Sequence, residues 1–236
     1  MLCKIADLIA DIPETDDLVS RCREYLCCDG APAEIVIRPE LYRRGRYDPR
    51  TPESVVAYME SAYQFYKELV FRNGFYLHAS AVVYSGRAYL FSGDSGVGKS
   101  THSRLWQELY PGRVQVINDD KPALRRMDGT WYAYGTPWCG KDGINANAKA
   151  PLAGLCFLKQ ADSNRIRRMT ADEAVERIFP QTIYKMDSPS QVNAFLDQLQ
   201  LFLEQIPIYE LENRPELAAA ALSSETMLQG ALEAGL

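Results

Sequence analysis

The chain has 236 residues, 47% of them hydrophobic, so it is long enough and apolar enough to bury its own core. Its 26 Lys and Arg residues are outnumbered by 31 Asp and Glu residues, and the net charge of -5 disfavours a protein that holds nucleic acid by bulk positive charge. The N-terminus has no basic segment followed by an apolar one, and no apolar run is long enough to span a membrane. We therefore expect a cytoplasmic globular protein without a nucleic-acid or membrane partner.

The chain contains six cysteines, and none of them belongs to a CxxC pair. Only two histidines accompany them, which disfavours a zinc site. We expect free thiols, as is usual in a reducing cytoplasm.

The first 50 residues carry few regular signals. Apolar and polar residues alternate over 33–40, which predicts a strand. Thr51 as N-cap and Pro52 in the first turn predict the start of a helix, and Gly74 follows its end. The apolar face of this helix is expected to consist of Val55, Met59, Tyr63, Tyr66 and Val70. We interpret residues 1–50 as an N-terminal extension packed on a domain that spans 51–236.

The middle of the chain alternates strands and helices. Residues 75–84 and 87–92 predict two strands around a tight turn at Ser85-Gly86. A helix is expected over 101–110, and a further apolar strand over 114–118.

The second half of the chain continues this mixture. It predicts hairpin strands over 123–127 and 131–134, a strand over 155–158, helices over 171–178 and 191–205, a strand over 208–211 and a helix over 216–232. The basic cluster Arg165, Arg167 and Arg168 is interpreted as a solvated turn. Because several strands are joined by hairpins rather than by helices, we expect an α/β protein with a mixed sheet flanked by helices.

The stretch from Gly93 to Ser100, GDSGVGKS, matches the phosphate-loop pattern GxxxxGK[ST] and lies between a predicted strand and a predicted helix. Its glycines let backbone amides turn toward phosphate oxygens, and the N-terminus of the next helix adds its dipole. Lys99 is expected to reach the β- and γ-phosphates, and the Ser100 hydroxyl to bind Mg²⁺. The candidate nucleotide-binding residues are Gly93, Asp94, Ser95, Gly96, Val97, Gly98, Lys99, Ser100 and Thr101.

Three further polar residues accompany the loop. Asp119 and Asp120 end the 114–118 strand, where a carboxylate commonly orders the Mg²⁺ of a nucleotide. Adjacent carboxylates on an extended chain point in different directions, so one can serve the metal and the other an acceptor. His78 lies in an apolar strand that is expected to pair with the strand before the loop, which can bring its imidazole near the phosphates.

A strand histidine, a GDSGVGKS loop and an Asp-Asp pair, in this order, resemble the kinase domain of HPr kinase/phosphorylase, and phosphoenolpyruvate carboxykinase has a similar arrangement. The resemblance extends over roughly residues 75–125. It implies a P-loop domain of this superfamily, with a mixed, partly hairpin-paired sheet flanked by helices. It also implies that ATP and Mg²⁺ bind at the loop, that Asp119 is the general base, that Asp120 binds metal, and that Lys99 and His78 complete the catalytic set.

Residues 135–154 depart from this resemblance, because they lack the sequence that HPr kinases have after the Asp-Asp strand. HPr is therefore not the expected acceptor. The region is either an ordinary surface loop or one whose polar tips contact phosphate or acceptor. The candidates for such contacts are Trp138, Lys141, Asn145, Asn147 and Lys149.

Three functions are compatible with these motifs. The first is an ATP-dependent kinase that moves a phosphoryl group to a serine-type hydroxyl of a peptide, protein or small molecule. The second is a carboxykinase-like enzyme on a small acid, which needs a second metal at His78 and Asp120 and an arginine such as Arg72 or Arg87 for the carboxylates. The third is a nucleotide-binding module without transfer chemistry. The intact histidine and Asp-Asp pair favour chemistry, while the acceptor and the oligomeric state remain open.

Overall fold

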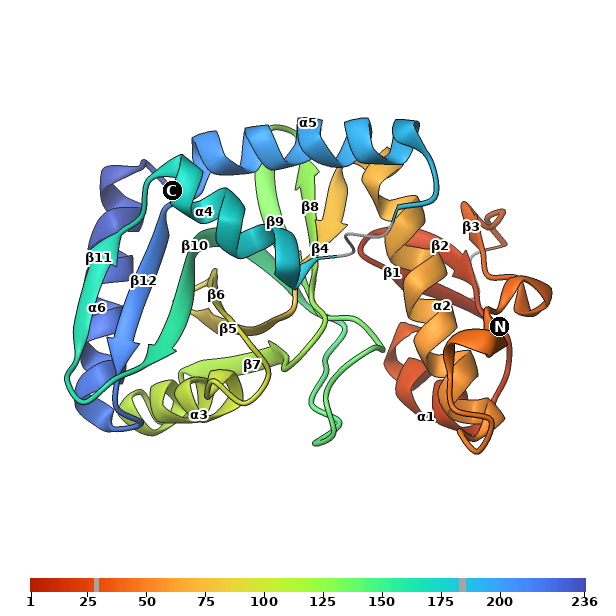
Figure 1. The fold of residues 1–236 in the computed structure, drawn as a ribbon, viewed down its shortest axis with the longest axis horizontal. Coiled ribbons are helices and arrows are strands. Elements are labelled where there is room, and N and C mark those ends of the chain that lie inside the picture. Colours follow the sequence, from red (N-terminus) through yellow and green to blue (C-terminus); the bar gives the residue numbers. More distant parts are fainter. Residues whose placement is uncertain (28–29, 183–185) are drawn as a thin grey trace.

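A computed structural model describes residues 1–27, 30–182 and 186–236 and has a mixed α/β fold (Figure 1). The strands are β1 (Leu2–Ile5), β2 (Leu8–Asp11), β3 (Ile35–Val36), β4 (Gly74–Tyr76), β5 (Ala79–Tyr84), β6 (Arg87–Ser92), β7 (Val114–Asn118), β8 (Ala123–Met127), β9 (Thr130–Tyr134), β10 (Lys149–Gln160), β11 (Arg165–Arg168) and β12 (Ile208–Asn213). The α-helices are α1 (Asp16–Cys22), α2 (Glu53–Leu69), α3 (Lys99–Leu109), α4 (Ala171–Ile178), α5 (Pro189–Gln205) and α6 (Leu217–Glu233). Short 3₁₀ turns are η1 (Arg23–Tyr25), η2 (Pro39–Leu41), η3 (Arg44–Arg46), η4 (Val70–Arg72) and η5 (Phe179–Gln181).

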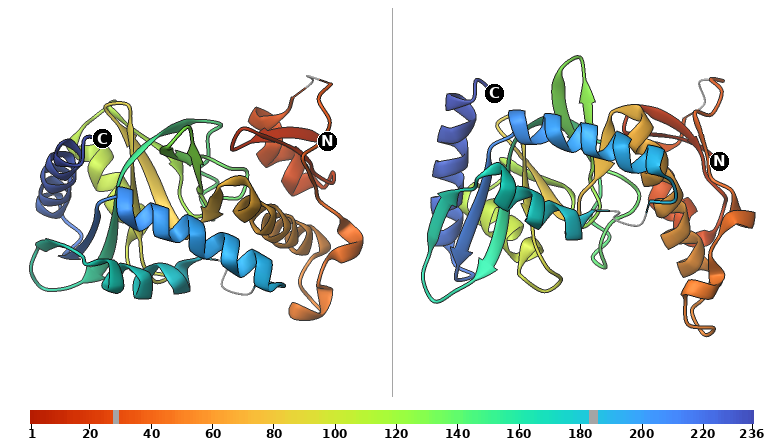
Figure 2. Two further views of the ribbon diagram at one scale, coloured as in Figure 1. Left: turned by 90° about the horizontal axis from the view of Figure 1, so that it is seen from above. Right: turned by 45° about the horizontal axis from the view of Figure 1, so that its top comes forward.

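Most strands form one mixed sheet in the order β4-β8-β9-β10-β6-β5-β7, and β12 joins it at β10 and carries β11. The 12-residue strand β10 holds the two parts of this sheet together. Its first residues pair antiparallel with β9, and its later residues pair parallel with β6 and β12. The strand predicted over 155–158 is the middle of β10. Helix α5 crosses β4, β8 and β9, and α6 lies along β11 and β12, so helices flank the sheet as predicted (Figures 1 and 2).

Aromatic side chains fill both faces of the sheet. Under α5, the ring of Phe75 packs edge to face with Trp131, Phe195 and Phe202, at centroid separations of 5.6, 5.6 and 5.3 Å. Under α3 and α6, Trp106 is the centre of a second buried cluster. Rings of this size each remove much apolar surface from water, so the two clusters hold the helices on the sheet.

The predicted hairpin around Ser85-Gly86 is confirmed as β5 and β6. The two turn residues have φ values of 51° and 77°, which suits a type I′ turn. Ala79 opposes Ser92 in this ladder, and Ala81 opposes Asn118 in the antiparallel pairing of β5 with β7. The start of β5 therefore meets the ends of β6 and β7 at one edge of the sheet. His78, the glycine-rich loop and the two aspartates adjoin these three strand ends.

The prediction of one strand over 75–84 is wrong, because the chain changes partners within it. β4 pairs with β8, whereas β5 pairs with β6 and β7. The break falls at Leu77 and His78, where the His78 amide donates to the Gln181 carbonyl at 2.7 Å. This bond satisfies the amide outside the sheet ladder. Apolar patterning does not reveal such a change of partner, since both strands are buried.

Helix α2 is present as predicted, but its start and its buried face differ. It begins at Glu53, and no side chain, Thr51 included, caps it. Val55 and Met59, predicted to face the core, are exposed at 41% and 38%. The buried residues are Val56, Ala57, Glu60, Ser61, Ala62, Phe65, Tyr66 and Leu69. This arc contains polar residues because α2 lies between the main sheet and the N-terminal strands (Figure 1), so hydrophobic periodicity alone does not locate it.

The N-terminal region has more regular structure than its sequence predicts. β1 and β2 form an antiparallel hairpin, β3 adds to β2 in parallel, and α1 follows the hairpin in the chain. The hairpin turn uses Ala6 and Asp7 with φ values of 52° and 59°, so the glycine that usually marks such a turn is missing. The strand predicted over 33–40 is reduced to β3. The region shares a buried cluster with Phe65 of α2 and with Trp138.

The C-terminal third contains one correction. The basic cluster predicted as a solvated turn is strand β11, which pairs antiparallel with β12. Arg167 forms ion pairs with Glu173 and Glu210, each at 2.9 Å, so its charge is compensated within the fold. The helices predicted over 171–178, 191–205 and 216–232 are confirmed as α4, α5 and α6.

Cys3, Cys22, Cys139 and Cys156 are buried thiols, and Cys28 lies outside the described residues. Cys3 and Cys22 belong to the N-terminal cluster, where they pack among apolar side chains. Within the ranges that the structure describes, no helix has both the length and the hydrophobicity needed to cross a membrane.

The buried carboxylate of Glu60 generates a stability prediction. It is 0% exposed and accepts bonds from the Arg43 guanidinium and, at 2.8 Å, from the Tyr47 hydroxyl. Glu60→Ala leaves Arg43 without its partner and should lower the free energy of unfolding by about 3 kcal/mol. The control Glu68→Ala removes a carboxylate that is 46% exposed and should cost no more than about 1 kcal/mol. Equilibrium denaturation in urea measures both, and equal effects would contradict the prediction.

Candidate active site

The glycine-rich loop between β6 and α3 has the backbone that phosphate binding requires. Gly93, Gly96 and Gly98 have φ values of 136°, 83° and 109°, a region that favours glycine. Gly98 is the N-cap of α3, so the amides of the first helical turn, beginning at Lys99, have no acceptor within the helix. An array of free amides at a helix N-terminus attracts anions.

The side chain of Lys99 folds back over this loop. Its ammonium donates to the carbonyls of Gly93 and Asp94 at 2.8 and 3.2 Å. Burial lowers the pKa of Lys99, and the carboxylates of Asp120 and Asp94 oppose the shift. Because both hydrogen-bond acceptors are neutral carbonyls, the charge of Lys99 is available to an incoming anion.

A cleft of about 610 Å³ opens beside the loop. One wall contains the predicted nucleotide-binding residues Ser95, Gly96, Gly98, Lys99, Ser100 and Thr101. His78, Asp119 and Asp120 line the same cleft, so the three motifs found in the sequence meet around one space. Gly93, Asp94 and Val97, although part of the loop, do not line it.

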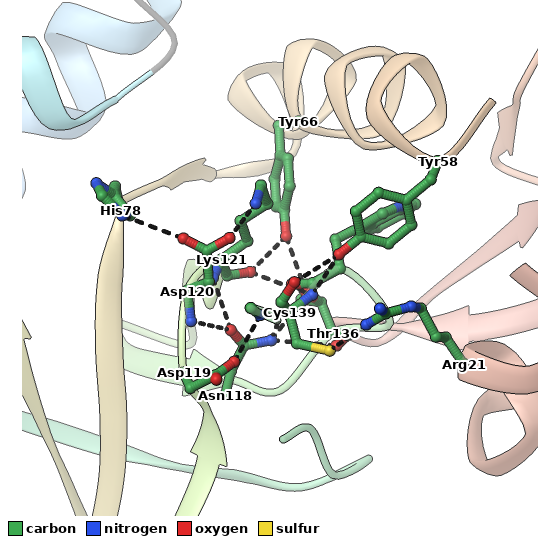
Figure 3. Close-up of polar contacts among 12 residues, drawn as sticks. Arg21, Tyr58, Tyr66, His78, Asn118, Asp119, Asp120, Lys121, Thr136 and Cys139 are labelled. Atoms are coloured by element: carbon green, nitrogen blue, oxygen red, sulfur yellow. Dashed lines mark hydrogen bonds and ion pairs between the residues drawn. The ribbon is translucent and has the colours of Figure 1, made fainter. Parts of the chain in front are cut away.

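Asp120 lies between two basic side chains (Figure 3). Its Oδ1 is 3.1 Å from His78 Nε2, and its Oδ2 pairs with the ammonium of Lys121. Burial raises the pKa of Asp120, but the contacts with His78 and Lys121 outweigh burial and hold the pKa well below its ordinary value. His78 Nδ1 bonds to Gln181 Oε1, and Gln181 Nε2 donates to Asp94 Oδ1, both at 3.0 Å. Gln181, which no sequence motif marks, therefore links the histidine to the glycine-rich loop.

Asp119 has a different environment. Its Oδ1 accepts a bond from the Gly140 amide at 2.6 Å, and it forms no ion pair with any cation of the described ranges. Burial, together with the charge of Asp120, raises the pKa of Asp119 against the opposing effect of the Gly140 amide. A Cβ atom at position 140 would lie 2.8 Å from Asp119 Oδ2, so glycine lets this loop approach the carboxylate without displacing it. Asp120 is thus an anion held in an ion pair, whereas Asp119 has no ion pair among the described residues and is more basic.

The turn that presents both carboxylates is built by Asn118, which is fully buried. Its Oδ1 accepts bonds from the amides of Asp120 and Lys121 at 2.9 and 2.6 Å. Its Nδ2 donates to the carbonyls of Thr136 and Trp138, both at 3.1 Å. This Asx turn redirects the chain at the end of β7. An asparagine directly before the Asp-Asp pair is the sequence signal that could have revealed it.

The far wall of the cleft comes from segments that carry no motif. Arg21 of α1 donates from Nη1 to Cys139 Sγ at 2.8 Å, and its guanidinium lies 4.8 Å from the centroid of the Tyr58 ring (Figure 3). The Tyr58 hydroxyl contacts the carbonyl and the amide of Cys139, both at 2.7 Å. Arg72 and Arg87, the arginines that the sequence suggested for substrate carboxylates, do not line this cleft.

The loop over residues 135–154 contributes less than its sequence suggests. Of its five candidate contacts, Lys141 alone lines the cleft in the described part of the chain. Trp138 is fully buried and donates from Nε1 to a serine of α2 at 3.0 Å, so it is a core residue. Asn145, Asn147 and Lys149 bond to residues of the N-terminal region. The polar side chains of this loop thus connect it to the N-terminal region.

The cleft offers oxygen ligands that suit Mg²⁺. Ser100, Asp119 and Asp120 line it, and Mg²⁺ commonly takes one or two protein oxygens together with phosphate oxygens and water. Across the described ranges, no three or more His, Cys, Asp and Glu side chains gather as a metal cage. This donor set fits a metal that arrives with a nucleotide.

No family model matches the sequence, and no curated protein matches it. Among solved structures, the chain is similar to the HPr(Ser) kinase/phosphatase from Coxiella burnetii, with 13% sequence identity and a TM-score of 0.37. The similarity covers 65% of this chain and 91% of that chain, and it is a distant one. The geometry of the cleft, rather than this distant similarity, therefore indicates the function.

We expect the two adjacent aspartates to titrate in opposite parts of the acid range. As the pH falls, Asp119 should be protonated first, because its pKa is raised, while Asp120 should stay ionised below its ordinary pKa. Carboxyl ¹³C NMR titration, with Asp119→Asn and Asp120→Asn for assignment, measures both. His78→Ala should move the pKa of Asp120 upward, since His78 makes its strongest lowering contact. Coincident titration of the two carboxyls in the wild type would contradict this electrostatic assignment.

Proposed function

We propose that the protein is an ATP-dependent phosphotransferase of the HPr-kinase-like P-loop type, which moves the γ-phosphoryl group of ATP to a hydroxyl acceptor. One observation carries the proposal: the glycine-rich loop and the unpaired carboxylate of Asp119 line the same cleft. A phosphate donor site and a general base in one cleft are what phosphoryl transfer to a hydroxyl requires.

The loop side of the cleft would bind the triphosphate. The amides of the first turn of α3 have no acceptor within the helix and would face phosphate oxygens. Lys99 would exchange its two carbonyl partners for oxygens of the β- and γ-phosphates, at a gain in charge complementarity. Ser100 and Asp120 would hold the Mg²⁺ that arrives with ATP, and this ion would neutralise charge on the phosphates.

The opposite side of the cleft would activate the acceptor. Asp119 Oδ1 is occupied by the Gly140 amide, which fixes the plane of the carboxylate and leaves Oδ2 for a hydroxyl. The raised pKa of Asp119 makes it a stronger base than an exposed aspartate. The acceptor oxygen would bond to the γ-phosphorus as the bond to the β-γ bridging oxygen breaks. ADP would leave, and the hydroxyl proton would pass to Asp119.

Two other functions receive less support. The carboxykinase-like reaction was predicted with Arg72 or Arg87 as the arginine for the substrate carboxylates, and neither of them lines the cleft. A binding module has no use for a buried carboxylate of raised pKa held beside a phosphate loop. Such perturbed groups are typical of reacting sites.

Replacement of Lys99 and of Asp119 should separate binding from chemistry. Lys99→Ala should weaken MgATP binding by about 10- to 100-fold, as expected for the loss of charge-assisted hydrogen bonds. Asp119→Asn should retain MgATP binding and lower transfer by about 10²- to 10⁴-fold. Calorimetry measures binding, and transfer of labelled phosphate to a pool of serine-containing peptides and free hydroxy amino acids measures chemistry. Tight binding without turnover on any acceptor would favour a binding module, and no binding by the wild type would refute the nucleotide site.

Gly140→Ala should damage chemistry without touching the nucleotide. The new Cβ atom would meet Asp119 Oδ2 at 2.8 Å and push the base out of position. A displacement of about 1 Å is expected to lower kcat by roughly 100-fold with MgATP affinity unchanged. Gly45→Ala, where a Cβ atom meets nothing within 4 Å, is the matched control and should behave as wild type. Equal activity of the two variants would mean that Asp119 is not the base.

A further inference from the structure

The positive charge of Arg21 is the feature of the cleft that nucleotide binding does not use. Arg21 belongs to α1, in the wall that faces the glycine-rich loop across the cleft. The Cys139 sulfur and the Tyr58 ring hold its guanidinium, and neither is an anion. Cys139 keeps its thiol form, because burial raises its pKa. Arg21 is thus positioned rigidly but lacks a carboxylate partner anywhere in the described residues.

The other charges of the cleft do not compensate Arg21. Asp120 is paired with Lys121 and His78, and Asp142 is paired with Arg104. Lys141 lines the same wall and, like Arg21, forms no ion pair within the ranges described. Two cations therefore remain in this wall after Lys99 is assigned to the triphosphate. Arg21 is partly buried, and an uncompensated cation in a cleft attracts an anionic ligand.

The position of Arg21 relates it to the acceptor rather than to the nucleotide. Arg21 contacts Cys139, and the next residue, Gly140, holds the carboxylate of Asp119. The residue that the guanidinium contacts, Cys139, is therefore the chain neighbour of Gly140, whose amide orients the Asp119 carboxylate. An acceptor with its hydroxyl at Asp119 Oδ2 places its neighbouring substituents toward this wall.

We propose that the acceptor is a hydroxyl compound with a free carboxylate a few bonds from the hydroxyl, and that Arg21, assisted by Lys141, binds this carboxylate. The planar fork of a guanidinium suits bidentate contact with a carboxylate. The cleft of about 610 Å³ must also hold the triphosphate, so the bound part of the acceptor is small. This inference rests on the proposed phosphoryl transfer, whose acceptor class it names.

A matched pair of probes tests the inference by binding alone. N-acetylserine and N-acetylserinamide share the hydroxyl and differ in the carboxylate. In the presence of a non-hydrolysable ATP analogue and Mg²⁺, we expect Asp119→Asn protein to bind the acid at least tenfold more tightly than the amide. Adding Arg21→Gln should abolish this preference, and Arg21→Lys should restore part of it. Arg50→Gln, at an exposed arginine of the same region, is the control and should leave the preference intact.

The outcomes distinguish this inference from the proposed function. A preference for the acid that depends on Arg21, without transfer to either probe, would keep the carboxylate site and refute phosphoryl transfer to such acceptors. Transfer to both probes with equal KM would keep the kinase and refute the carboxylate site. If Arg21→Gln in the otherwise wild-type enzyme lowers kcat and leaves the acid-to-amide ratio of KM unchanged, Arg21 acts on the transferred phosphoryl group and the proposal is wrong. Should Arg21→Gln fail to fold by circular dichroism, Lys141→Met and the wild-type preference decide the question.

Discussion

The buried amide of Asn118 is the contact on which the geometry of the cleft depends. Its carbonyl oxygen closes the turn after β7, and its NH₂ group reaches the carbonyls of Thr136 and Trp138. Thr136 in turn donates to the Lys121 carbonyl at 2.8 Å, and the Tyr66 hydroxyl donates to the same oxygen at 2.5 Å. Asn118, Thr136 and Tyr66 are buried, so an unmatched donor or acceptor among them would cost about 1–3 kcal/mol. The Asp-Asp turn, the following loop and α2 are therefore held in one arrangement.

This network also explains why the N-terminal region belongs to the cleft. α2 supplies Tyr66 to the turn and Tyr58 to the far wall, eight residues apart and thus on one side of the helix. On its other sides, α2 carries the hairpin of β1 and β2 together with α1, which brings Arg21 to Cys139. Helix α2 therefore fixes the positions of both the carboxylates and the guanidinium.

The sequence predicts those parts of the cleft that are formed by residues close together in the chain. A phosphate loop needs glycines at fixed spacing before a lysine, and the hairpin of β5 and β6 needs a residue pair that tolerates positive φ, so both can be read in the chain. Arg21, Tyr58 and Cys139 meet only through tertiary packing, and no spacing marks them. The face of α2 was mispredicted for a related reason: the helix is covered from two sides, so polar residues such as Glu60 are buried and Val55 is exposed. Trp138 is buried for the same reason, because its indole packs between α2 and the loop.

The two neighbouring aspartates have different charge environments. Asp120 is neutralised by His78 and Lys121, which lets Asp119 carry the remaining negative charge of the pair in a buried position. Without those two basic groups, repulsion between the adjacent carboxylates would favour protonation of one of them, and the site would lose the proposed base. The ammonium of Lys121 limits what Asp120 can do alone, because a metal at the same carboxylate oxygen would have to replace it. In the proposed function, Mg²⁺ bound with the triphosphate would favour that exchange, since the released ammonium would then face the added phosphate charge. With the nucleotide side occupied, Asp119, which forms no ion pair within the described residues, would be the carboxylate that faces the proposed acceptor, in the cleft that Arg21 also lines.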